Sequence, residues 1–153
     1  VQNEVNKEWP FRTLWQHYQC DLSNKTFAIW GVAFKPGVAD VETSPALRVI
    51  DALLAQGANL QIHDPEALQT LAARYPGNQQ IQLMTHNYDA CVGADALLVL
   101  TAWPEYASPD FTRIVSQLKN PLIIDGRNLY DPNRVQSAGI TYYCMGRSCL
   151  TNA

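Results

Sequence analysis

Short apolar runs alternate with helix-like segments along most of this chain, and this alternation constrains its fold more than any other feature. The apolar runs lie at residues 27–32, 59–63, 81–84, 96–100, 121–125 and 140–144. The most apolar of them, residues 96–100, is typical of a central strand that is buried on both faces. The alternation predicts an α/β fold: a Rossmann-like, doubly wound, mainly parallel sheet with helices on both faces.

The helical segments are indicated by apolar spacing and by the residues at their boundaries. They lie at residues 45–56, 66–75, 88–91, 110–119 and 132–138. The first has clear ends, because Ser44 can cap it, Pro45 suits the first helical position and Gly57 stops it. We therefore expect a helix to begin directly after the loop at residues 33–43.

The first twenty residues carry apolar side chains near helical spacing despite Pro10. They predict either the end of a helix or two short helices, arriving from a missing upstream region and connecting this domain to another. Residues 21–153 then form a single Rossmann-like domain.

The composition favours one globular domain and excludes several classes of partner. The chain has 153 residues, of which 47% are hydrophobic and 16% charged. Its net charge is −3 and its 11 lysines and arginines are scattered, so we expect no nucleic-acid partner. No apolar run approaches the roughly 18 residues that span a bilayer, which predicts a soluble, cytoplasmic protein without a membrane partner.

The cysteines and histidines give no sign of a metal site or a catalytic nucleophile. The four cysteines form no CxxC pair, and the three histidines fall in separate segments without ligand spacing. We expect buried or idle thiols, which is the commoner state of free cysteine. No nucleophile with a partnered base stands out, so the sequence places no chemistry on this chain.

The loop at residues 33–43 should lie at the carboxyl end of a strand, where ligands bind in open α/β sheets. It holds Lys35 between Phe34 and Pro36. Lys35 can supply a charge to a phosphate or a hydrogen bond to a sugar hydroxyl, and Phe34 can pack against a ring or simply fill the core. The glycine-rich dinucleotide fingerprint is missing, so a nucleotide would be bound by side chains as well as backbone. The alternative is a solvated surface lysine.

A second loop follows the strand at residues 121–125 and places Arg127 at the same edge. A guanidinium there suits bidentate recognition of a phosphate, and two cations at one edge suggest an anionic ligand. The alternative is that Arg127 pairs with Asp125 or Asp131 and ties the loop down. In a third loop at this edge, Trp103 could shield a ligand, but an aromatic anchor that packs the loop down is the favoured interpretation.

Three motifs resemble the C-terminal, UDP-binding domain of the UDP-glucose/GDP-mannose dehydrogenase family, and its bacterial UDP-glucose 6-dehydrogenases most of all. They are Trp30 to Pro36 with Ser44-Pro45, Thr101 to Trp103, and Asp125 to Pro132. Residues 142–147 resemble the family's closing strand and tail. The resemblance implies that Phe34, Lys35 and Arg127 contact the UDP-sugar.

The resemblance also implies the chemistry of a longer protein. Family members oxidise a nucleotide sugar such as UDP-glucose to its uronic acid, using NAD and a catalytic cysteine. Both the cysteine motif and the main NAD-binding domain lie outside this chain, so the chain alone should be inactive. The full-length protein is expected to be a homodimer.

Two positions depart from the family pattern. Glu42 stands where the family has an arginine that reaches NAD, so the cofactor-binding residue of this domain is unknown; Arg48 could substitute for it. Ala102 stands where a glutamate is common. These departures leave two alternatives open: a non-catalytic remnant that serves assembly or regulation, and a dehydrogenase for a different nucleotide sugar.

Overall fold

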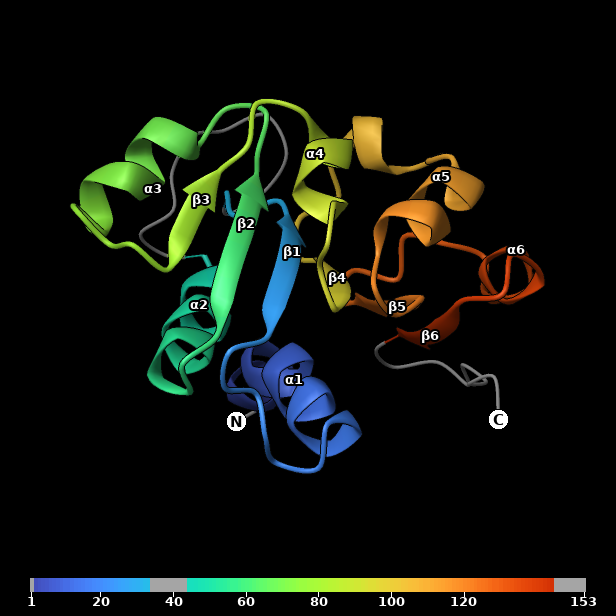
Figure 1. Cartoon of the computed structure of the whole chain (residues 1–153), viewed down its shortest axis with the longest axis horizontal. Coiled ribbons are helices and arrows are strands. Elements are labelled where there is room, and N and C mark those ends of the chain that lie inside the picture. The colour runs from blue at the N-terminus through green and yellow to red at the C-terminus, as the bar shows by residue number, and fades with distance from the viewer. Residues whose placement is uncertain (1, 34–43, 145–153) are drawn as a thin grey trace.

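Six strands form one sheet in which every neighbouring pair is parallel (Figure 1). The computed structural model describes residues 2–33 and 44–144, with side chains from residue 9 onward. The sheet order is β3-β2-β1-β4-β5-β6. The strands are β1 Thr26–Trp30, β2 Asn59–His63, β3 Ile81–Leu83, β4 Ala96–Val99, β5 Leu122–Asp125 and β6 Thr141–Cys144. This confirms the predicted doubly wound α/β fold, with a sheet that is parallel throughout the described residues.

The helices alternate with the strands as the pattern predicts. They are α1 Gln2–His17, α2 Ala46–Ala55, α3 Leu68–Arg74, α4 Asn87–Cys91, α5 Phe111–Gln117 and α6 Pro132–Ser137, with a 3-10 turn η1 at Pro104–Tyr106. Helix α2 begins one residue later than expected, yet the Ser44 hydroxyl still accepts a hydrogen bond from the Ala46 amide. The residues before it, 34–43, lie outside the described part of the chain.

Helix α1 is continuous through Pro10, so the expectation of two short helices is not met and the single-helix alternative holds. It packs beside α2 and against β5. Its Leu14 is fully buried, and Pro10 lies where a Cβ on Gly126 would come within 3.4 Å of its Cγ. Right-handed crossovers place α2 and the helices after β4 on opposite faces. Helix α1 therefore covers sheet surface on the α2 side that the later crossovers leave open.

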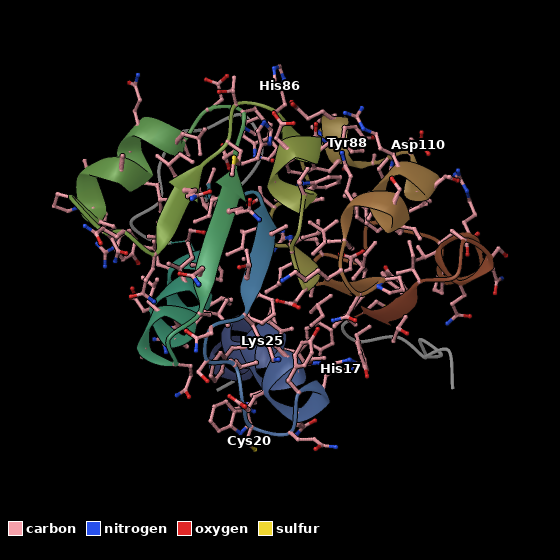
Figure 2. All side chains as sticks on the ribbon, viewed as in Figure 1. His17, Cys20, Lys25, His86, Tyr88 and Asp110 are labelled. Atoms are coloured by element: carbon pink, nitrogen blue, oxygen red, sulfur yellow. The ribbon has the colours of Figure 1, made fainter. Side chains whose placement is uncertain are left out.

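The core lies around the central strands. Every residue of β4 and β5, and residues 27–30 of β1, are buried. The strand order reverses between β1 and β4, which makes the carboxyl ends of these two strands the topological switch point. Figure 2 shows the two ends of the sheet: His86, Tyr88 and Asp110 lie toward the carboxyl end, and His17 and Lys25 toward the opposite end.

Candidate functional site

The chain leaves β1 at the switch point through a glycine that no other residue could replace without strain. Gly31 has φ +93°, and a Cβ placed on it would lie 2.6 Å from the Thr101 Cβ. The Thr101 hydroxyl donates to the Ala33 carbonyl at 2.9 Å, and the Gly31 amide donates to the His63 carbonyl at 2.8 Å. The first residues after β1 are thereby held tightly against the loop after β4.

A buried carboxylate at the end of β2 ties the same two loops to a third. Asp64 is 3% exposed. Its Oδ2 accepts from the Val32 amide at 2.8 Å, the Ala33 amide at 3.0 Å and the Trp103 indole at 3.2 Å. Its Oδ1 accepts from the amides of Glu66 at 2.9 Å and Ala67 at 2.8 Å. One side chain thus fixes the segments that follow β1, β2 and β4.

The hydrogen bonds of Asp64 also bear on which class of nucleotide can bind at the carboxyl edge of the sheet. In dinucleotide-binding domains, an acidic residue near the end of the second strand binds a ribose hydroxyl. Asp64 directly follows β2, but both of its oxygens accept hydrogen bonds from the protein itself. Among the described residues, Asp64 therefore differs from such a ribose-binding acid, because its oxygens are engaged within the protein.

The second loop is organised around another buried carboxylate. Asp125 is fully buried. Its Oδ1 accepts from the Arg127 amide at 2.9 Å, and its Oδ2 accepts from the Leu129 amide and the Tyr142 hydroxyl, each at 2.6 Å. Asp131 caps α6 by accepting from the Asn133 amide. The acids considered as ion-pair partners for Arg127 are therefore engaged with main-chain donors and a phenol.

The Arg127 side chain itself points outward from this loop. It is exposed, and within the described residues it takes part in no ion pair. The loop is held by its main chain, so the guanidinium is not needed to hold it and is open to a ligand. Bidentate recognition of a phosphate or carboxylate is the chemistry that such a group offers.

Trp103 is an anchor for the third loop and does not form an exposed surface for a ligand. It is 7% exposed, and its indole N–H is spent on Asp64. Ala102 beside it is half-buried. The favoured interpretation of Trp103, that it packs the loop down, is confirmed.

Aromatic side chains pack against one another at the carboxyl end of β1, next to the switch point. Tyr106 stacks on Trp30 with ring centroids 4.9 Å apart, and its hydroxyl lies 2.8 Å from the His63 Nδ1. Burial lowers the pKa of His63, an effect reinforced by His86 and opposed by the charge of Asp64. Burial also raises the pKa of Tyr106, so both groups are neutral near pH 7.

The buried imidazole predicts a pH-dependent loss of stability. In the unfolded chain His63 takes up a proton near pH 6.5, whereas in the folded chain its pKa is lower. The unfolded state then binds more protons, so the free energy of unfolding should fall as the pH drops below about 6.5. Urea unfolding at pH 7.5 and pH 5.5 should show a larger loss for the wild type than for His63→Asn. Equal losses in the two proteins would contradict the assignment.

A model of a known protein family matches the sequence of this chain. The match covers residues 28–132, more than half of the chain, and the model describes the UDP binding domain of the UDP-glucose/GDP-mannose dehydrogenase family. The chain belongs to this family. The matched range begins within β1 and includes β2 to β5, the two buried carboxylates and Arg127.

Two relatives of known name are bacterial members of the family. It is 40% identical over 150 residues to UDP-glucose 6-dehydrogenase of Pseudomonas aeruginosa, covering 96% of this chain and 33% of that protein. It is 37% identical over 129 residues to UDP-glucose 6-dehydrogenase TuaD of Bacillus subtilis, covering 84% of this chain and 28% of that protein. The chain thus spans about a third of the length of these relatives.

Solved structures share the fold. One is NDP-N-acetyl-D-galactosaminuronic acid dehydrogenase of Methanosarcina mazei, with a TM-score of 0.76, 26% identity, and coverage of 94% of this chain and 30% of that one. Another is UDP-glucose dehydrogenase of Pyrobaculum islandicum, with a TM-score of 0.74 at 24% identity over 92% of this chain and 29% of that one. The second likeness is one of fold alone.

The residues that the family resemblance selects are only partly placed by the structure. Phe34, Lys35 and Glu42 lie outside the described residues, so their approach to Arg127 stays a prediction. Arg48 is exposed on α2. The structure adds Asp64 and Asp125, which sequence reasoning did not assign to the site. The available signal was an acidic residue at the carboxyl end of a strand, followed by a proline or glycine turn.

The cysteines differ from expectation at one position. Cys20 is exposed and Cys91 buried, and both are free thiols, with burial raising the pKa of Cys91 to about 12. Cys144 is buried but disulfide-bonded, so the expectation of a buried or idle thiol is wrong there. Among the described residues, no group of three or more histidine, cysteine or acidic side chains is placed to hold a metal ion. None of the helices in that part of the chain has the length and apolar character needed to cross a membrane.

Proposed function

We propose that this chain binds the UDP part of a nucleotide sugar at the carboxyl edge of β1, β4 and β5. The observation that carries the proposal is the exposed Arg127 on a loop that Asp125 holds by its main chain, within a domain that matches the family's UDP binding domain. Arg127 would contact the diphosphate as a bidentate donor. Phe34 and Lys35, which follow the anchored Ala33, would contact the UDP-sugar from the first loop.

In this proposal the chain is the substrate-binding part of an NAD-dependent dehydrogenase that converts UDP-glucose to UDP-glucuronate. The relatives named UDP-glucose 6-dehydrogenase, at 40% and 37% identity, support this choice of sugar. NAD would be bound mainly by a domain beyond this chain, which would also supply the catalytic cysteine. The isolated chain would therefore bind ligand without turnover, and the whole protein would act as a homodimer.

A second candidate is a dehydrogenase for a different nucleotide sugar. It is favoured by the likeness to the Methanosarcina mazei structure, whose name specifies an N-acetylated uronic acid. Both candidates share the UDP contact that this domain would make. They differ in the hexose, which the resemblance assigns largely to the central part of the family's chain.

Amide chemical shifts of the ¹⁵N-labelled chain, followed as UDP is added, would test the proposed site even at millimolar affinity. Shifts are expected at Ala33, Thr101 and Arg127, with smaller changes for UMP because it lacks the second phosphate. ADP serves as the control for the base, and it should bind more weakly than UDP. The proposal fails if UDP causes no shifts, or only shifts at the opposite edge, around Asn59 and Gln61.

A further inference from the structure

We propose that Asp64 is a positioning residue for the UDP site, acting through the segment that leads from β1 to Phe34 and Lys35. This inference rests on the proposed function. It adds Asp64, which would not itself contact the ligand. Asp64 lies 31 and 32 residues from the two amides that it holds after β1. Its effect on a ligand would pass through Ala33, the last described residue before the proposed contacts.

Asp64 accepts hydrogen bonds from loop residues and not from residues inside a strand or a helix. Val32 and Ala33 follow the last residue of β1, so their amides have no ladder partner in the sheet. Buried amides of this kind need an acceptor, and the Asp64 Oδ2 supplies it at 2.8 and 3.0 Å. The carboxylate therefore sets the path along which the chain leaves the sheet.

The same oxygen also couples this path to the loop after β4. The Trp103 indole donates to the Asp64 Oδ2, and the Thr101 hydroxyl donates to the Ala33 carbonyl. Both main-chain groups of Ala33 are thus fixed: Asp64, directly after β2, accepts from the amide, and Thr101, in the loop after β4, donates to the carbonyl. The two loops at the switch point form one unit, with Asp64 at its centre.

An amide in place of this carboxylate would break the arrangement without changing its size. Asp64 receives donors on both oxygens, three on Oδ2 and two on Oδ1. Asparagine offers one acceptor oxygen, and its NH₂ group would face N–H donors whichever way the amide is turned. At least two buried donors would lose their acceptor, and the carboxylate would no longer hold Val32 and Ala33 in place.

A matched control lies at the other edge of the same strands. The Asp95 Oδ2 accepts from the Thr26 amide at 3.0 Å and so joins the start of β4 to the start of β1. Asp95→Asn makes the same chemical change as Asp64→Asn, but at the amino edge, away from the proposed ligand. An asparagine at this position still offers one oxygen to the Thr26 amide, so Asp95→Asn controls for the loss of one negative charge, and the stability of each variant is measured separately by urea unfolding.

The test measures the UDP dissociation constants of the wild-type chain, Asp64→Asn and Asp95→Asn by amide-shift titration well below their unfolding temperatures. We expect Asp64→Asn to bind UDP about tenfold more weakly than the wild type. A tenfold change in the dissociation constant corresponds in free energy to the loss of about one charge-assisted hydrogen bond. Asp95→Asn should stay within about twofold of the wild type. Without UDP, the Val32 and Ala33 amide protons should move upfield in Asp64→Asn.

A folded Asp64→Asn with wild-type affinity overturns the inference, as does an equal loss of affinity in Asp95→Asn. Absence of UDP binding in the wild type instead overturns the proposed function, and this inference with it.

A milder variant keeps the inference testable if Asp64→Asn does not fold. Trp103→Phe removes one donor from the Asp64 Oδ2 and leaves an aromatic ring in place. The carboxylate would then be free to shift relative to the amides of Val32 and Ala33. We expect those two amide resonances to move and UDP to bind about two- to threefold more weakly. Wild-type resonances and affinity in this variant would show that Asp64 does not couple the two loops.

Discussion

Replacing Gly31 with alanine is expected to lower the free energy of unfolding by about 3 kcal/mol or more, which puts it among the strongly destabilising single substitutions. Two independent costs combine at this position. The backbone has φ +93°, a conformation that costs an L-residue about 1–2 kcal/mol. The new Cβ would also lie 2.6 Å from the Thr101 Cβ and 2.9 Å from the Thr101 amide nitrogen, so one of the two loops must move. Urea unfolding followed by tryptophan fluorescence measures the loss.

Gly139→Ala separates the two costs. Gly139 has φ +86°, close to that of Gly31, but nothing lies within 4 Å of a Cβ built there. This control should therefore lose only the conformational part, about 1–2 kcal/mol. The difference between the variants measures how tightly the loop after β1 packs on the loop after β4. If Gly31→Ala were no less stable than Gly139→Ala, the close contact with Thr101 would be refuted.

The strands were predictable because burial in a parallel sheet is a local property of sequence. Four of the five residues of the run at 96–100 form the fully buried β4, which ends one residue early at Val99, and the predicted and observed bounds of β2 coincide at Asn59–His63. Helix α1 was harder to predict, because a proline at position 10 normally ends or kinks a helix. Here the helix continues, with Pro10 buried and packed close to Gly126. That contact joins two parts of the chain that lie far apart in the sequence, so the residues around neither position predict it.

The site was predictable only in outline for the same reason. Topology alone brings the loop after β1 and the loop after β5 to one edge, so Arg127 could be selected from sequence. The choice between an ion pair and an exposed guanidinium depended on where Asp125 directs its oxygens, and they turn toward main-chain amides and the Tyr142 hydroxyl. The role of Asp64 depends on partners more than thirty residues away in both directions. A single sequence contains no signal for such pairings.

Under the proposed function, Arg127→Ala should weaken UDP binding about 30- to 100-fold, because a bidentate, charge-assisted contact worth about 2–3 kcal/mol would be lost. The substitution is suited to the test because it keeps the main-chain amide that Arg127 donates to Asp125. The loop should therefore hold its path, and the thermal unfolding temperature should change little. Amide-shift titration with UDP at low and high salt gives the affinity and its electrostatic part.

Three further variants decide what Arg127 does. Arg127→Lys keeps the charge but loses the planar fork, so its affinity should fall between those of the wild type and Arg127→Ala. Lys119→Ala removes one exposed positive charge near the amino end of β5, and it should bind UDP almost as the wild type does. Lys35→Ala should cost less than Arg127→Ala, since a lysine contacts a phosphate as a single point charge. An equal or larger loss for Lys35→Ala would assign the diphosphate to the first loop. An equal loss for Lys119→Ala would mean that general charge attraction, and not a built contact at the carboxyl edge, accounts for the binding.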